Sequence, residues 1–205
     1  TNILESDHFL GRVSVSIDLK ELTLKEISAF WKSQNFGLGS YENLLALSIT
    51  GGVPKYLEEI TKQEPTSQAM AGLCFDPSGI LYRDFKSIFK DVFNRRAKGL
   101  EKIIRICLNE RMTPSQLAKK MEKDQDGDFT YALHILELSG FLSRDFLFNP
   151  LTGEASKFSY LRVKDNYTRF YLKIIEPLKK KIESGGKHIL DVKDLKNIES
   201  LMGYQ

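Results

Sequence analysis

The sequence is poor in cysteine and has no long run of apolar residues. It contains 2 cysteines among 205 residues. No apolar stretch reaches the roughly 18 residues that a membrane-spanning helix needs. Cys74 and Cys107 lie far apart among apolar neighbours, at no metal-binding spacing. These features argue against a disulfide-stapled secreted scaffold, and they predict reduced core thiols in a cytoplasmic protein.

Charge of one sign and clusters of metal-ligand residues are also scarce. The net charge of +3 permits contact with nucleic acid but gives only weak support for it. His8, His134 and His188 are isolated, with no cysteine, histidine or carboxylate at ligand spacing. No Ser–His–Asp or Cys–His arrangement stands out. The sequence therefore predicts neither a metal site nor a catalytic residue.

A phosphate-binding loop is the third absence. No G-x-x-x-x-G-K-[ST] run occurs, so nothing in the sequence would cradle a triphosphate. No strand pattern ends in an acidic residue that would hold Mg²⁺. We therefore do not expect this chain to hydrolyse ATP alone.

Most of the chain has the apolar spacing of amphipathic helices. Two capping boxes, Thr23 to Glu26 and Thr113 to Gln116, predict helix starts. The first helix should end near Gly37 and Gly39, and Ser40 should cap the second. Further helices are expected at about 54–60, 67–75, 79–93, 98–109, 129–138 and 167–182, the last with a kink at Pro177.

Two regions have strand patterns. Residues 13–19 alternate apolar and polar side chains, which is typical of a strand with one buried face. No other strand pattern occurs before Phe141, so we expect the partners of this strand to lie upstream of the sequence. Residues 141–148 and 157–163 flank turn signals and predict a hairpin.

Three short helices followed by a hairpin form the order of a winged helix-turn-helix. Its third helix usually reads DNA with basic or amide side chains, but this one has no Lys or Arg. Basic residues lie instead at Arg95, Arg96, Lys98, Arg144, Lys157 and Arg162. We expect weak, sequence-independent DNA binding at most, and a solvated basic face is the alternative.

The stretch from Gly51 to Leu57, Gly-Gly-Val-Pro-Lys-Tyr-Leu, is the most informative short motif. Two glycines let a backbone approach a ligand closely, and the following helix start offers free N–H groups. A plain corner between two helices, with Pro54 in the first turn, explains the same spacing.

This stretch resembles the glycine–x–proline lid motif of STAND-type AAA-like ATPases. In particular, it is similar to a prokaryotic family, best known from archaea, that joins a P-loop domain, a winged helix and a restriction-nuclease-like domain. Leu10-Gly11-Arg12 and the strand after it resemble the end of that ATPase core. Residues 103–121 resemble the first winged-helix segment, and Met202-Gly203-Tyr204-Gln205 resembles the junction to the nuclease-like domain.

The resemblance implies a mainly α (α+β) fold in four parts. Residues 1–22 would be the last strand region of a P-loop core, 23–96 a helical lid, 97–165 a winged helix, and 166–205 a C-terminal helix and linker. The P-loop core and the nuclease-like domain would lie outside this sequence, and ATP and Mg²⁺ would bind with the core restored.

The resemblance also implies roles for single residues. Pro54 and its neighbours Gly51, Gly52 and Tyr56 would touch the adenine end of ATP from the lid side. Arg12 would sense the γ-phosphate, and an ordinary core-edge arginine is the alternative. The expected function is to couple nucleotide state to a partner or a downstream domain. Two rival functions are a stand-alone winged-helix DNA-binding regulator and a protein adaptor without a ligand. The sequence leaves the oligomeric state open.

Overall fold

The computed structural model of the chain describes residues 19–60, 65–184, 192, 195 and 198–203, without the side chain of Lys157. Arg12 and residues 13–18 of the predicted strand lie outside these ranges. Leu19 is exposed and belongs to no regular element. The described part is mainly α-helical, as predicted, and no helix in it is long and apolar enough to cross a bilayer.

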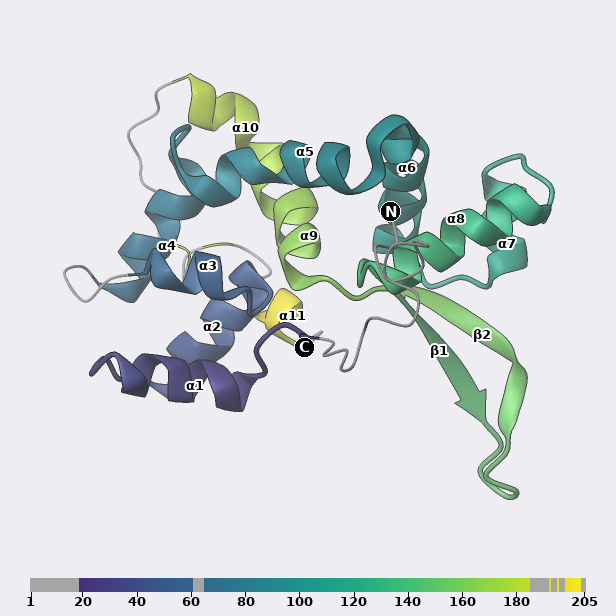
Figure 1. Cartoon of the computed structure of the whole chain (residues 1–205), viewed down its shortest axis with the longest axis horizontal. Helices are drawn as coiled ribbons and strands as arrows, with labels where there is room; N and C mark the ends of the chain where they lie inside the picture. The colour runs from purple at the N-terminus through teal and green to yellow at the C-terminus, as the bar shows by residue number, and fades with distance from the viewer. Residues whose placement is uncertain (1–18, 61–64, 185–191, 193–194, 196–197, 204–205) are drawn as a thin grey trace, which may run out of the picture.

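Five helices make up the first part of the fold (Figure 1). They are α1 (Leu24–Ser33), α2 (Ser40–Thr50), α3 (Pro54–Glu58), α4 (Thr66–Phe75) and α5 (Ile80–Phe93). The first capping box is confirmed, because the Glu26 N–H donates to the Thr23 hydroxyl at 3.4 Å and the Thr23 N–H donates to the Glu26 carboxylate at 2.8 Å.

Two predicted boundaries in this part are wrong. Helix α1 ends at Ser33, before the glycines, because Asn35 adopts a φ of 53° and its N–H turns back to the Lys32 carbonyl. The N-cap of α2 is Gly39, without a side-chain cap, and Ser40 is the first helical residue. Local propensity does not resolve boundaries at this precision.

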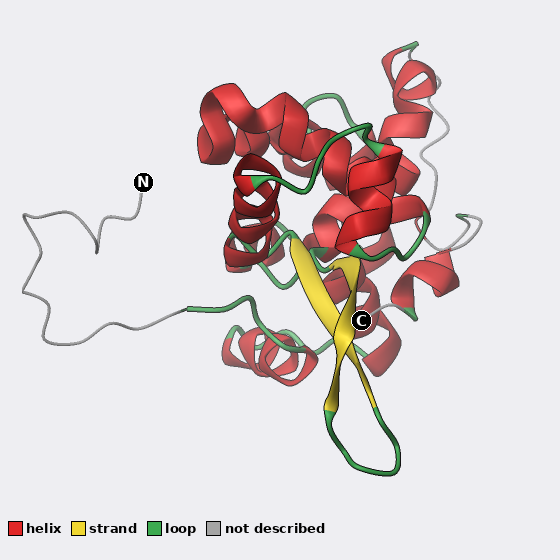
Figure 2. Cartoon of the chain, turned by 90° about the vertical axis from the view of Figure 1, so that its right-hand side faces the viewer, coloured by secondary structure: helices red, strands yellow, loops and turns green. Residues whose placement is uncertain are grey.

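The second part begins with a short 3₁₀ turn and ends in a hairpin. Its elements are η2 (Asn94–Arg96), α6 (Ala97–Asn109), α7 (Pro114–Lys120), α8 (Gly127–Leu138), β1 (Leu142–Phe148) and β2 (Ala155–Val163). The strands pair antiparallel, with Leu142 opposite Val163, and the register shifts between Phe146 and Phe148. Met112 adds an isolated bridge to Leu161. The distal half of the hairpin projects away from the helices (Figures 1 and 2).

A final helical segment returns the chain to the first part. It consists of α9 (Asn166–Phe170), a π-helical turn η3 (Tyr171–Ile175) and α10 (Glu176–Glu183), with α11 (Ile198–Met202) beyond. We predicted a proline kink here, and the structure places a wide turn just before Pro177. Pro177 has no N–H to donate to the carbonyl four residues back. One residue earlier, the Glu176 N–H donates to the Tyr171 carbonyl five residues back, which is the hydrogen-bond spacing of a π-helical turn.

Aromatic side chains join the two parts into one core. The ring of Tyr171 stacks on Phe85 of α5, with centroids 4.0 Å apart and planes 9° apart. Phe141, at the base of the hairpin, lies 4.9 Å from Phe89 and 5.3 Å from Phe93. Helix α9 packs between the early helices α1–α5 and the hairpin unit, which comprises residues 94–163 from η2 to β2 (Figure 1).

Candidate functional site

The corner between α2 and α3 is built around two buried glycines with positive φ. Gly51 ends α2 with φ 69°, and its N–H donates to the Leu47 carbonyl at 3.0 Å. Gly52 has φ 78°, and its carbonyl accepts a hydrogen bond from the Leu22 N–H at 2.9 Å. A Cβ on Gly52 would lie 2.2 Å from the Leu22 carbonyl oxygen. Only glycine fits both the conformation and this approach.

Helix α9 encloses the other side of the corner. A Cβ on Gly51 would lie 3.3 Å from a carboxylate oxygen of Asp165 and 3.5 Å from the Tyr167 nitrogen. The close approach that these glycines allow is thus used by the chain's own backbone. Pro54, at the first position of α3, and Lys55 remain exposed. A ligand at this corner would meet Pro54 and Lys55 first.

Tyr56, the fourth predicted lid residue, is buried and anchors α3. Its ring lies 5.3 Å from that of Tyr167, and its hydroxyl is 3.5 Å from the Asp84 carboxylate. Burial and the nearby Asp84 charge raise the pKa of the Tyr56 phenol. Lys55 forms an ion pair with the same carboxylate at 3.3 Å. The side chain of Tyr56 therefore holds the corner on α5.

Asp165, which the sequence reasoning missed, fixes the start of α9 beside Gly51. Its carboxylate accepts a hydrogen bond from the Thr168 N–H at 2.6 Å. Burial raises the pKa of Asp165, against the lowering effect of the Thr168 bonds. The available signal was local, because an Asp three residues before Thr168 and ahead of an aromatic helix is an N-cap pattern. Nearby, the buried Arg169 donates to the Val163 carbonyl at 3.1 Å.

Three of the predicted nucleic-acid residues lie together where η2 joins α6. Arg95, Arg96 and Lys98 are all exposed. The Arg96 guanidinium sits over the Tyr131 ring, 4.9 Å from its centroid. Arg95 and Arg96 line a hollow of about 300 Å³ together with Lys123 and Phe129.

The predicted arginines of the hairpin differ from these three because carboxylates of the chain pair with them. Arg144 forms an ion pair with Glu137 at 2.7 Å, and Arg162 forms one with Asp145 at 3.0 Å. Arg111 shares the same Asp145 carboxylate at 3.0 Å. Burial would raise the pKa of Asp145, but hydrogen bonds from the two arginines outweigh it and lower that pKa. The Lys157 side chain lies outside the described part. The hairpin arginines are thus largely neutralised by carboxylates of the chain itself.

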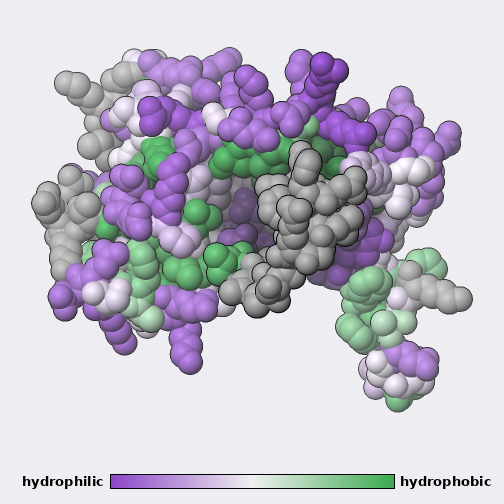
Figure 3. Space-filling view, in the orientation of Figure 1, coloured by the Kyte–Doolittle hydropathy of each residue, from purple (hydrophilic) through white to green (hydrophobic). Residues whose placement is uncertain are grey.

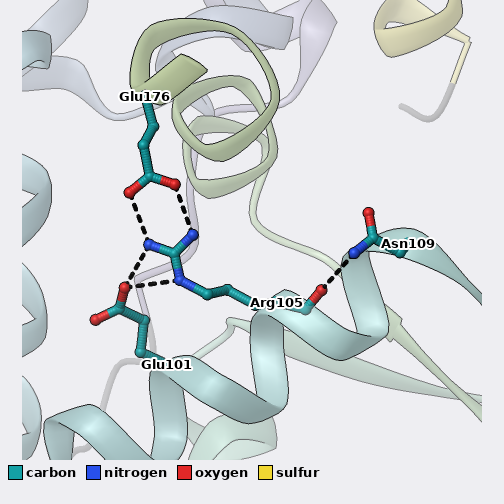
Figure 4. A network of polar contacts seen from close by, with 4 residues as sticks. All are labelled: Glu101, Arg105, Asn109 and Glu176. Carbon is teal, nitrogen blue, oxygen red and sulfur yellow. Dashed lines mark hydrogen bonds and ion pairs between the residues drawn. The ribbon is translucent and has the colours of Figure 1, made fainter. Parts of the chain in front are cut away.

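Arg105 of α6 also has acidic partners (Figure 4). Its guanidinium contacts Glu176 at 2.6 and 2.7 Å and Glu101 at 2.9 and 2.5 Å. These contacts tie α6 to α10. Hydrogen bonds from Arg105 lower the pKa of Glu176.

The residues present fit only part of an ATP site. Pro54 and Lys55 offer an exposed edge that could meet an adenine ring, but the sequence has no loop for the triphosphate. Within the described ranges, no group of three or more His, Cys, Asp or Glu could hold a metal ion. No family model, curated protein or solved structure matches this chain.

Proposed function

We propose that this chain is the lid and winged-helix portion of an ATP-binding AAA/STAND-like ATPase. In this proposal it couples nucleotide state to a partner or a downstream domain. The observation that carries it is the Gly51–Pro54 corner. Its two buried glycines have positive φ, Leu22 and α9 pack against them, and Pro54 is left exposed. A corner of this kind presents a fixed apolar edge to the adenine of a nucleotide held by a P-loop core.

The packing around the corner supports a route for coupling. Tyr56 connects α3 to α9 through Tyr167, whose hydroxyl donates to the Leu81 carbonyl of α5 at 2.8 Å. Helix α9 follows directly after β2. Closure of the lid over ATP would therefore displace α9 and the hairpin unit together. Hydrolysis would let core and lid separate.

The second half of the proposal is the winged helix. Helices α6, α7 and α8 precede the hairpin in the order of that domain, and Met112 forms an isolated antiparallel bridge to Leu161 of the hairpin. The second capping box begins α7, with the Thr113 N–H donating to the Gln116 side chain at 2.8 Å. The wing arginines are paired internally, which supports packing on protein over gripping DNA.

Calorimetry with ATP and Mg²⁺ tests the proposal on the full product of the gene, with its upstream coding sequence included. We expect ATP to bind the full product, and this chain alone to show no tight binding. Pro54→Ala should weaken ATP affinity about fivefold, since losing a small apolar contact costs about 1 kcal/mol. Pro114→Ala removes a first-turn proline from α7 and serves as the matched control. A full product that binds no ATP would contradict the proposal.

The second candidate is a stand-alone winged-helix DNA-binding regulator. The exposed Arg95 and Lys98, which have no carboxylate partner among the described residues, favour it. Fluorescence anisotropy with labelled duplexes at two salt concentrations separates the two functions. Nanomolar, sequence-selective binding supports the regulator. Binding in the range of roughly 10⁻⁴–10⁻⁶ M without sequence preference is ordinary electrostatic attraction.

The cations that matter for such binding can be distinguished by substitution. Replacing Arg95 and Lys98 by Gln should weaken DNA binding and flatten its salt dependence. Replacing Arg144 and Arg162 by Gln should change DNA binding less, because Glu137 and Asp145 already neutralise them. Equal losses from both pairs would show that the wing also contacts the phosphates.

A further inference from the structure

The distal part of the hairpin, residues 146–158, forms an apolar arm. It carries five large, exposed hydrophobic side chains, namely Phe146 (47%), Leu147 (52%), Phe148 (67%), Leu151 (94%) and Phe158 (69%). The arm stands apart from the body, and much of it is hydrophobic (Figure 3). A two-stranded ribbon in water is only marginally stable, and contiguous exposed apolar side chains mark contact surfaces. The arm therefore has the character of a surface that another molecule covers.

The nearly neutral charge of the arm indicates what kind of molecule would cover it. Only Glu154 and Lys157 ionise between residues 146 and 158, one of each sign. The nearest arginines, Arg144 and Arg162, already pair with carboxylates. A phosphate backbone would gain almost no attraction here. Two copies of the arm would not repel each other, so a neutral apolar protein surface fits best.

The outer edge of β1 supplies a way of pairing. Among the described residues, β1 pairs only with β2, which leaves the main-chain groups on its other edge without a strand partner. Edge strands are normally protected by charge, proline or a covering element. The segment Phe146-Leu147-Phe148 has no charged residue and no proline. This edge is thus open to the addition of a strand.

We propose that a second copy of this chain occupies this edge, with β1 lying antiparallel to the partner's β1 about a two-fold axis at Leu147. This register places Leu147 opposite its own counterpart and Phe146 opposite the partner's Phe148. It opposes no like charges, because Asp145 faces the partner's Asn149. Aromatic cross-strand pairs stabilise antiparallel sheets, and a two-fold contact buries the same side chains of both copies at once.

The small contact area of the arm limits the expected affinity of the dimer. A stable dimer buries roughly 800 Å² on each partner, and a single short edge with a few side chains offers less. We therefore expect a reversible dimer with a dissociation constant in the micromolar range. This inference is independent of the ATPase proposal, because it uses no residue of the Gly51–Pro54 corner.

Sedimentation equilibrium of this chain, from about 5 to about 500 µM, is the first test. We expect a monomer–dimer equilibrium. Phe146→Ser combined with Phe148→Ser should weaken it at least tenfold. Leu138→Ser removes a comparably exposed side chain from α8 and should leave it unchanged. Circular dichroism checks that each variant is folded. A monomer at all concentrations, or a dimer indifferent to the arm substitutions, overturns the proposal.

Cysteine cross-linking tests the register itself. Directly opposed residues have Cα atoms about 4.5–5.5 Å apart, which suits a disulfide. Leu147→Cys should therefore give covalent dimers on mild oxidation. Phe158→Cys is the control, since the β2 strands of the two copies would lie about 14 Å apart at the usual strand spacing. Cys74 and Cys107 are buried and do not compete. Equal cross-linking at both positions would overturn the β1-to-β1 arrangement.

Discussion

At the scale of single residues, two glycines should respond in opposite ways to an added methyl group. Gly52→Ala would place a Cβ 2.2 Å from the Leu22 carbonyl oxygen at a φ of 78°. We expect it to lower the free energy of unfolding by about 1–3 kcal/mol, the range of strain at a special backbone position. Urea denaturation followed by circular dichroism measures the change.

Gly72→Ala is the matched control within α4. A Cβ on Gly72 meets nothing within 4 Å, and its backbone is helical. Alanine should raise the free energy of unfolding by about 0.5–1 kcal/mol, since glycine loses more conformational entropy in a helix. If Gly52→Ala did not lower the free energy of unfolding, the result would contradict the close packing of Leu22 against Gly52.

Arg105 makes a pH-dependent contribution that can be separated from its packing. Arg105→Ala removes the contacts to Glu101 and Glu176, and it should cost about 1 kcal/mol at pH 7 because the groups are half-exposed. The pKa of Glu176 in the folded protein lies below its ordinary 4.5. The contribution from Glu176 is therefore complete above about pH 4.5, and it is lost as the pH falls through the folded-state pKa.

Urea denaturation of the wild type and Arg105→Ala between pH 7 and pH 3 checks this expectation. The difference in unfolding free energy between the two proteins should narrow at the acid end. Arg83→Ala, an exposed arginine of α5 with no carboxylate partner among the described residues, should show no such narrowing. A constant difference for Arg105 would contradict the assigned role of Glu176.

At the scale of elements, a buried hydrogen bond helps to hold α9 on α5. Tyr167→Phe removes the hydroxyl that donates to the Leu81 carbonyl at 2.8 Å and leaves that carbonyl without this donor. We expect a loss of about 1–2 kcal/mol in unfolding free energy. Tyr131→Phe, at an exposed position of α8, should be nearly neutral. A neutral Tyr167→Phe would mean that aromatic packing alone positions α9.

Elements that depend on local sequence were predicted well. The capping boxes at Thr23 and Thr113 are confirmed, because a cap needs only residues three positions apart. The pairing of Arg162 with Asp145 and the enclosure of Gly52 by Leu22 were not predicted. Each depends on segments brought together only by the fold. The lid and winged-helix functions and the role of Arg12 stay predictions.

At the scale of the whole molecule, the two buried thiols report whether the chain unfolds as one unit. Cys74 lies in α4 and Cys107 in α6, and burial raises the pKa of both, that of Cys107 to about 12. Neither should react with a thiol reagent at pH 8 in the folded protein. Because Phe141 at the base of the hairpin packs on Phe89 and Phe93 of α5, both thiols should become reactive in one urea transition.

Cys74→Ala and Cys107→Ala variants, labelled separately across the same urea series, give the two curves to compare. Coincident midpoints support a single cooperative core. Labelling of Cys107 at clearly lower urea than Cys74 would show that the hairpin unit opens independently of the early helices.

The wide turn at Tyr171–Ile175 sets the angular phase between α9 and α10. A π-helical turn is equivalent to one extra residue inserted into an α-helix, and each α-helical residue rotates the chain by about 100°. Deleting Lys173 would restore regular winding and swing every later side chain around the axis by that angle. Glu176 would lose its ion pair with Arg105. Glu183 would lose the hydrogen bond that its carboxylate accepts from the Tyr82 hydroxyl at 2.9 Å. The extra residue thus aligns both ends of this helical segment with their separate partners.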